Sequence, residues 1–170
     1  DFYLKHNFYQ QPTANGTIFA DYEVPITADS TPANTIIYGH NLITRNMFEP
    51  LSYFRTQGFD FMKENYRLNF DTIYEKNEYL IYAVFLTNTT EEYGEVFNYQ
   101  NCVSFGSKSE FDTFVAECLD RSFYYTGIDL RYGDELLTLS TCDFSMFSDM
   151  RLVVAARKVR DDESSILDPE

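Results

Sequence analysis

Basic residues and histidines are scarce in this sequence of 170 residues. It has 13 Lys and Arg against 27 Asp and Glu, a formal net charge of -14, and two histidines, His6 and His40. Such a surface repels phosphate backbones and anionic lipid headgroups at long range, so nucleic-acid binding is disfavoured. Two histidines without a CxxC pair are too few for a zinc site, and the acidic residues are not spaced as in a calcium loop. We therefore expect neither a metal nor another cofactor.

Long apolar runs are absent as well. No stretch of about 18 consecutive apolar residues occurs, so the sequence contains no spanning helix. The start at Asp1 has no Met and lacks the basic and then apolar residues of a signal peptide. We expect a fragment from which an N-terminal anchor has been removed.

The three cysteines are too few and too irregular for a disulfide framework. Cys102, Cys118 and Cys142 are an odd number at unrelated spacings, so at least one thiol is free. We predict that Cys102 and Cys118 are core residues and that they do not form a disulfide.

Apolar and aromatic residues are plentiful, at 44% and 18% of the sequence, which is enough for a packed core. The length predicts one domain, which we place at residues 1–160, followed by an acidic, frayed C-terminal tail at 161–170.

Most of the sequence has the pattern of a β protein. Short runs rich in β-branched and aromatic residues alternate with polar turn clusters, which predicts a mainly β fold. Seven strands at this spacing indicate a closed barrel or a sandwich. We place the strands at 16–21, 35–38, 67–74, 78–86, 129–132, 136–141 and 151–159, with turns at 75–77 and 132–134.

Two segments are predicted to be helical. Ser107 and Glu110 form a capping box, and the apolar stripe that begins at Phe111 and includes Cys118 then predicts an amphipathic helix over 109–121. A shorter helix is predicted over 47–57. The first of these helices lies in the crossover before the final pair of strands.

Cys142 is the first candidate for a catalytic role. The apolar strand 136–141 leads directly to this thiol, and a strand end fixes a nucleophile while the following loop leaves it accessible. The alternative is that Cys142 is a small buried hydrophobe, the more common role for an arbitrary cysteine. The adjacent Asp143 would repel a thiolate at Cys142 unless its carboxylate points away.

His40 and Arg151 also lie at strand ends. His40 follows the apolar strand 35–38 and Gly39, and an imidazole can exchange protons near neutral pH. Arg151 begins the last strand, and an antiparallel pairing would bring it back beside Cys142, where a guanidinium can stabilise an oxyanion. Taken singly, each residue is more often structural or solvent-exposed.

Three separated motifs together resemble a known family. They are Tyr38–Asn41 (YGHN), Thr138–Cys142 (TLSTC) and Arg151–Val154 (RLVV). In this order they resemble the sortases, the cysteine transpeptidases of Gram-positive cell surfaces, over about residues 3–159. The serine in the second motif and the helix before the final hairpin are most similar to class B.

The resemblance implies a closed eight-stranded β-barrel and a set of roles. Cys142 would be the nucleophile, His40 the general acid and base, and Arg151 the residue that stabilises substrate and oxyanion. Ser140, Thr141 and Asn41 would contact the substrate. The helix at 109–121 would form one wall of the peptide groove.

The resemblance also implies partners and a location. Cys142 would cleave a C-terminal sorting signal after Thr and pass the acyl group to an amine of a peptidoglycan precursor, or to a pilin lysine. The enzyme would be held at the extracellular face of the cell membrane by an N-terminal anchor outside this sequence.

Other functions remain open at this point. The same residues would suit a wall-anchoring or a pilus-polymerising sortase, or a cysteine protease that only hydrolyses. In a non-catalytic extracellular β-barrel binding module, Cys142, His40 and Arg151 would be unrelated.

Overall fold

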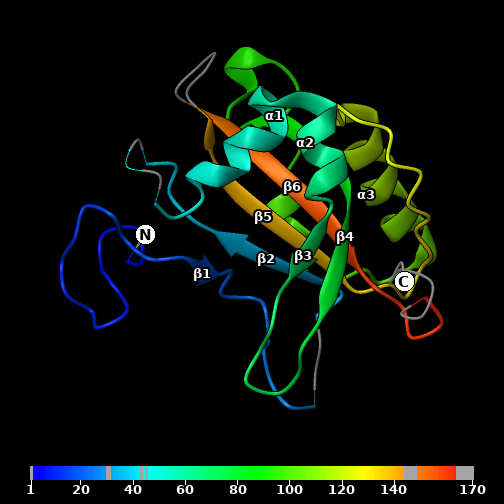
Figure 1. The fold of residues 1–170 in the computed structure, drawn as a ribbon, viewed down its shortest axis with the longest axis horizontal. Helices are drawn as coiled ribbons and strands as arrows, with labels where there is room; N and C mark the ends of the chain where they lie inside the picture. The colour runs from blue at the N-terminus through cyan, green and yellow to red at the C-terminus, as the bar shows by residue number, and fades with distance from the viewer. Residues whose placement is uncertain (1, 30–31, 43, 45, 144–148, 164–170) are drawn as a thin grey trace.

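The computed structural model describes residues 2–29, 32–42, 44, 46–143 and 149–163. These form one curled six-stranded sheet in the order β1-β2-β5-β6-β4-β3 (Figure 1). Strands β2 and β5 are parallel, and every other neighbouring pair is antiparallel. The strands are β1 (Phe19–Ala20), β2 (Asn34–Tyr38), β3 (Arg67–Asn69), β4 (Glu78–Asn88), β5 (Leu136–Asp143) and β6 (Met150–Lys158). The prediction of a mainly β fold is therefore confirmed.

The predicted closed eight-stranded barrel is not confirmed. Within the described part of the chain the sheet has six strands, with β1 and β3 at its two edges. The strand predicted at 129–132 is wrong, because this segment belongs to no strand and its charged side chains form ion pairs. Arg131 pairs with Asp129 at 2.9 Å, and Asp129 also pairs with Arg160 at 3.1 Å.

Two other predicted strands are shorter than expected. The strand predicted at 16–21 is reduced to β1, and the strand predicted at 67–74 is reduced to β3. The predicted hairpin between β3 and β4 is present, but its loop is longer than 75–77. Phe70 N–H donates to the Asn77 carbonyl, and Thr72 N–H donates to the Glu75 carbonyl.

A capped helix lies in the crossover between β4 and β5. Helix α3 spans Lys108–Arg121, and the Ser107 hydroxyl accepts the Glu110 N–H at its start. The Glu110 carboxylate in turn accepts the Gly106 N–H. The capping box therefore forms, although the glutamate reaches one residue further back than the usual pattern.

Further helical turns cover the other face of the sheet. The segment predicted as one helix at 47–57 folds instead as the 3-10 helix η1 (Glu49–Ser52), α1 (Tyr53–Thr56) and α2 (Gly58–Glu64). Figure 1 shows α1 and α2 over the strands in the upper part of the view and α3 to their right. Two more 3-10 helices, η2 (Glu91–Tyr93) and η3 (Tyr99–Asn101), lie between β4 and α3.

The sheet separates two hydrophobic cores. Adjacent residues of one strand face opposite sides, so Ile36 belongs to one core and Ile37 to the other. The core with Ile36 contains Phe111, Phe114 and Cys118 of α3. The core with Ile37 contains residues of η1, α1 and α2, including Leu51, Phe54 and Met62. Packed side chains therefore cover both faces of the central strands, and this packing holds the strand ends in fixed positions.

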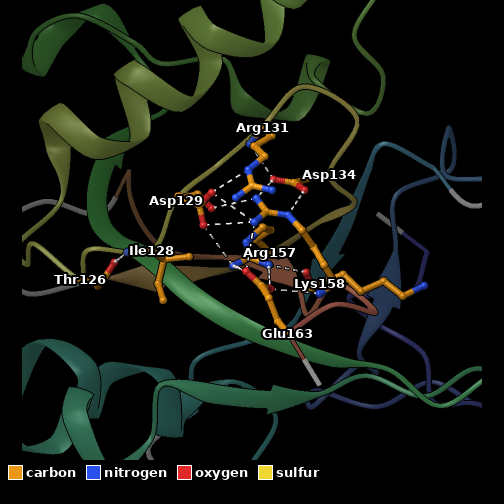
Figure 2. Close-up of polar contacts among 9 residues, drawn as sticks. Thr126, Ile128, Asp129, Arg131, Asp134, Arg157, Lys158 and Glu163 are labelled. Atoms are coloured by element: carbon orange, nitrogen blue, oxygen red, sulfur yellow. Dashed lines mark hydrogen bonds and ion pairs between the residues drawn. The ribbon is translucent and has the colours of Figure 1, made fainter. Parts of the chain in front are cut away.

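The segment after β6 is bound to the domain. Arg157 of β6 is 1% exposed, and its guanidinium forms a two-point ion pair with Glu163. Glu163 also pairs with Arg160, at 3.0 Å, and Figure 2 shows the cluster that joins these residues to Asp129 and Asp134. Glu163 is therefore tied to the domain, whereas Asp161 and Asp162 are exposed and residues 164–170 lie outside the described part, so the acidic tail at 161–170 stays a prediction.

Candidate active site

Strands β5 and β6 bring Cys142 and Arg151 together. The two strands are antiparallel, and Cys142 is the direct register partner of Arg151. Directly opposed residues point to the same face, with Cβ atoms about 4.5–5.5 Å apart. The antiparallel return expected from the sequence is therefore present, and it sets the Arg151 side chain on the same face of the sheet as Cys142.

Strand β2 brings His40 to the same end of the sheet. Tyr38 pairs with Ser140 in the parallel register of β2 and β5, and Gly39 N–H continues the ladder by donating to the Ser140 carbonyl at 3.2 Å. The Thr141 hydroxyl donates to the Gly39 carbonyl at 2.8 Å. Both the N–H and the carbonyl of Gly39 are therefore held by hydrogen bonds to β5, just before the chain reaches His40.

Gly39 is needed here because the backbone runs close to an aromatic ring. A Cβ at this position would lie 2.8 Å from Cγ of Phe48 and 3.2 Å from a side-chain carbon of Ile18. Carbon atoms pack at about 3.5–4.0 Å, so even an alanine would force the His40 backbone or the Phe48 ring to move.

The three predicted catalytic residues line one cavity. Its volume is about 340 Å³, and its walls include Cys142, His40 and Arg151 as well as Ser140 and Thr141. Cys142 and His40 are both half-buried, so neither side chain is sealed inside the protein. Placement in a common cavity is the arrangement that the sequence motifs led us to expect, and their catalytic roles remain a proposal.

The three residues predicted to contact the substrate form hydrogen bonds within the protein. The Ser140 hydroxyl lies 2.6 Å from the Tyr99 hydroxyl, and both side chains are almost fully buried. The Asn41 amide donates to the Cys142 carbonyl at 2.9 Å. Together with the Thr141 bond to Gly39, these contacts position the cavity wall, and contact with a substrate stays a prediction.

Asp143 points away from the thiol. Successive side chains of a strand face opposite sides, and the Asp143 carboxylate accepts a hydrogen bond from Arg55 at 3.3 Å. Its side chain is 6% exposed. The Asp143 carboxylate therefore points away from Cys142, which is what the sequence requires if Asp143 is not to repel a thiolate there.

The other two cysteines differ from Cys142. All three thiols are free, but Cys118 is fully buried in the core beneath α3, which confirms its predicted role. Cys102 is half-buried rather than buried. Burial raises the pKa of both Cys118 and Cys102, and the charge of Glu110 raises the pKa of Cys102 further. Neither belongs to the walls of the cavity, so Cys142 is the candidate nucleophile.

Tyr99 is a cavity residue that the sequence reasoning missed. It lies in η3, is 1% exposed, and reaches the cavity wall through its bond to Ser140. Burial raises the pKa of Tyr99, while the hydrogen bond to Ser140 and the charge of Arg151 act in the opposite direction. In the sequence Tyr99 is an aromatic residue in a polar stretch, and this pattern does not predict where its side chain lies in the fold.

Asp21 and Tyr38 form a second pair in the cavity wall that the sequence did not indicate. The Tyr38 hydroxyl donates to the Asp21 carboxylate at 2.9 Å. Burial and this carboxylate both raise the pKa of Tyr38.

No group of three or more metal-ligating side chains occurs among the described residues. None of the helices in that part of the chain has the length and apolar character of a membrane span.

The family model for the Sortase domain matches residues 9–159. The chain belongs to the sortase family. The match covers β1 to the end of β6 and therefore includes Cys142, His40 and Arg151.

Relatives of known structure are class B sortases. A mutant form of Clostridium perfringens sortase B superimposes with a TM-score of 0.80 at 28% identity, covering 94% of this chain and 71% of that one. Listeria monocytogenes sortase B gives a TM-score of 0.76 at 28% identity, covering 92% and 81%. A Staphylococcus aureus sortase B–substrate complex, 24% identical with a TM-score of 0.78, shares the fold and covers 94% and 69%.

Curated sequences agree with this assignment. Listeria monocytogenes sortase B is 30% identical over 143 residues, which are 84% of this chain and 54% of that protein. Staphylococcus aureus sortase B is 24% identical over 157 residues, 92% of this chain and 60% of that protein. The resemblance to class B is confirmed, and the chain spans somewhat more than half the length of these relatives.

Proposed function

We propose that this sortase domain is a cysteine transpeptidase that cleaves a C-terminal sorting signal after Thr. The observation that carries the proposal is the single cavity lined by Cys142, His40 and Arg151, of which Cys142 and Arg151 are register partners on neighbouring strands. A nucleophile, a proton carrier and a fixed cation at one strand end are the groups that acyl transfer requires.

In the acylation step, the Cys142 thiol gives its proton to His40, and the sulfur forms a bond to the carbonyl carbon of the Thr residue. Arg151 stabilises the negative charge that develops on the carbonyl oxygen. As the C–N bond breaks, His40 gives its proton to the leaving amine, and a thioester remains on Cys142.

In the transfer step, an acceptor amine attacks the thioester carbon. His40 takes the proton that the amine loses, and the thiolate of Cys142 leaves with its bonding electrons. The products are a new amide and the free enzyme. No cofactor takes part in either step.

The acceptor that we propose is an amine of a peptidoglycan precursor. The relatives named above are sortases B, and this similarity supports wall anchoring over pilus polymerisation. We also propose that residues 1–160 act as a single catalytic domain at the extracellular face of the membrane of a Gram-positive bacterium. The sortase match over 9–159 supports these bounds.

A transfer assay tests the proposal. A labelled sorting-signal peptide is incubated with the protein, with and without an amine acceptor, and the products are separated. We expect the amine to increase turnover and to appear in the product, whereas a protease that only hydrolyses would give the same product at the same rate. Oligoglycine and lysine-containing acceptors, compared at one peptide concentration, distinguish the wall-anchoring role from the pilus role.

Two cysteine variants identify the nucleophile. Cys142→Ala is expected to abolish cleavage and transfer while keeping the fold, as checked by circular dichroism. Cys102→Ala, which alters another half-buried free thiol, is the matched control and should keep activity. Full activity of Cys142→Ala would contradict the proposal and favour a binding module.

A further inference from the structure

His40 is held by a main-chain group from a distant part of the sequence. Its Nε2 lies 2.8 Å from the carbonyl oxygen of Leu4, 36 residues earlier. A carbonyl oxygen can only accept a hydrogen bond, so Nε2 must carry a proton. The chemistry of the partner thus assigns the tautomer: when the ring is neutral, Nδ1 is the atom without a proton.

The side chains near His40 that could orient it have other partners. The Asn41 amide is bound to the Cys142 carbonyl, and the Asp143 carboxylate faces Arg55 on the opposite side of the sheet. The Asp21 carboxylate accepts from Tyr38. Within the described part of the chain, the recorded hydrogen-bond partner of the His40 ring is the Leu4 carbonyl.

The Leu4 carbonyl is fixed by a small folded segment, residues 2–17, which lies beside β1 (Figure 1). Thr17 N–H donates to the Tyr3 carbonyl and Thr13 N–H donates to the Lys5 carbonyl, both at 2.9 Å. The Tyr3 ring stacks on Phe19 of β1 at 5.7 Å between centroids. Leu4 itself is half-buried and lines the cavity with His40 and Cys142.

Gly16 allows the segment to pack in this way. Its φ of +60° lies in the left-handed region, and a Cβ there would be 2.7 Å from the carbonyl oxygens of both Leu4 and Tyr3. A larger residue at position 16 must therefore change the packing of this backbone against the Leu4 and Tyr3 carbonyl oxygens.

We propose that the Leu4 carbonyl is the positioning group of His40. It takes the part that a carboxylate or amide side chain takes in other nucleophile–histidine sites, where a third group fixes the tautomer and orientation of the ring. This inference rests on the proposed transpeptidation. The Nε2 proton stays in its bond to Leu4, while Nδ1 takes the proton of the Cys142 thiol, gives it to the leaving amine and later takes one from the acceptor amine.

A matched pair of glycine variants tests the proposal. Gly16→Ala places a Cβ 2.7 Å from the Leu4 carbonyl oxygen and is expected to move it, whereas Gly127→Ala has the same left-handed strain, with φ of +73°, and meets no atom within 4 Å. We expect Gly16→Ala to lower kcat for sorting-peptide acylation about 100-fold with KM little changed, since misplacing a reacting group by about 1 Å costs this much. Gly127→Ala should keep the wild-type kcat.

Nitrogen NMR of His40 supplies a readout that is independent of activity. At a pH where the ring is neutral, the wild type should show a proton on Nε2 and none on Nδ1, with His40→Gln used to assign the signals. Gly16→Ala should give a mixture of the two tautomers, and Gly127→Ala should match the wild type.

The outcomes separate this inference from the proposed function. A neutral wild-type ring with its proton on Nδ1 overturns the inference, even if Gly16→Ala does not fold. Unchanged kcat and tautomer in a folded Gly16→Ala also overturn it. If the Nε2 tautomer is found but Cys142 forms no thioester, the proposed function fails while the assignment of the ring stands.

Discussion

Replacing Glu163 with glutamine should destabilise the domain, because it removes the carboxylate that forms the two-point ion pair with Arg157 and leaves Arg157 with the more distant Asp129, at 3.9 Å. The Arg157 guanidinium is 1% exposed and donates to both Glu163 oxygens, at 2.5 and 3.1 Å. Breaking a fully buried ion pair costs about 3–5 kcal/mol, and an exposed pair contributes about 0–1 kcal/mol. With one partner buried and the other 21% exposed, we expect about 2 kcal/mol.

Urea denaturation at pH 7 measures this change. For a chain of 170 residues, about 2 kcal/mol also corresponds to a fall in Tm of about 4–8 °C. Asp162→Asn is the matched control, since Asp162 is exposed in the same turn, and it should stay within about 0.5 kcal/mol of the wild type. If Glu163→Gln unfolds at the same urea midpoint as the wild type, the ion pair with Arg157 does not stabilise the domain.

The effect should also depend on pH. The hydrogen bond from Arg157 lowers the pKa of Glu163 below its ordinary value of 4.5. A carboxyl group with a lowered pKa in the folded state contributes stability above its unfolded pKa, and this stability is lost as the pH falls through the folded pKa. The difference between wild type and Glu163→Gln should therefore be full at pH 7 and shrink below about pH 4.5. A difference that does not change with pH would point to lost packing instead of lost charge.

Three further substitutions have expected outcomes. Gly39→Ala places a Cβ against Phe48 and should cost about 1–3 kcal/mol in urea denaturation and slow peptide acylation; unchanged stability would show that the ring moves freely. Ser107→Ala removes the cap of α3 and should cost about 1 kcal/mol by thermal denaturation with activity retained. Tyr99→Phe leaves the buried Ser140 hydroxyl without its partner and should cost about 1–3 kcal/mol, measured against wild type in urea.

Features that depend on nearby residues were predicted well from the sequence. The alternation of apolar residues located β2, β4, β5 and β6, and the capping box at Ser107 located α3. Cys142 and Arg151 lie at strand ends, and His40 lies two residues after the end of β2. The pairing of these strands therefore brings the three residues to one end of the sheet.

Features that depend on distant partners were not predictable. The segment 129–132 has the alternation of a strand, yet its charges pair with Arg160, and nothing local to the segment indicates this. The same holds for the Tyr99 bond to Ser140, which joins residues 41 positions apart. The contact between His40 and the Leu4 main chain could not be predicted from the sequence, because every residue has a main-chain carbonyl and none is distinguished by its residue type.

Mass spectrometry of the acylated protein tests the central claim most directly. The protein is mixed with a sorting-signal peptide without an acceptor amine, quenched in acid and digested. The account predicts an acyl adduct on the peptide that contains Cys142, cleaved after Thr and released by an added amine. An adduct on Cys102 or another residue, or turnover with no adduct under conditions that trap thioesters, would contradict it.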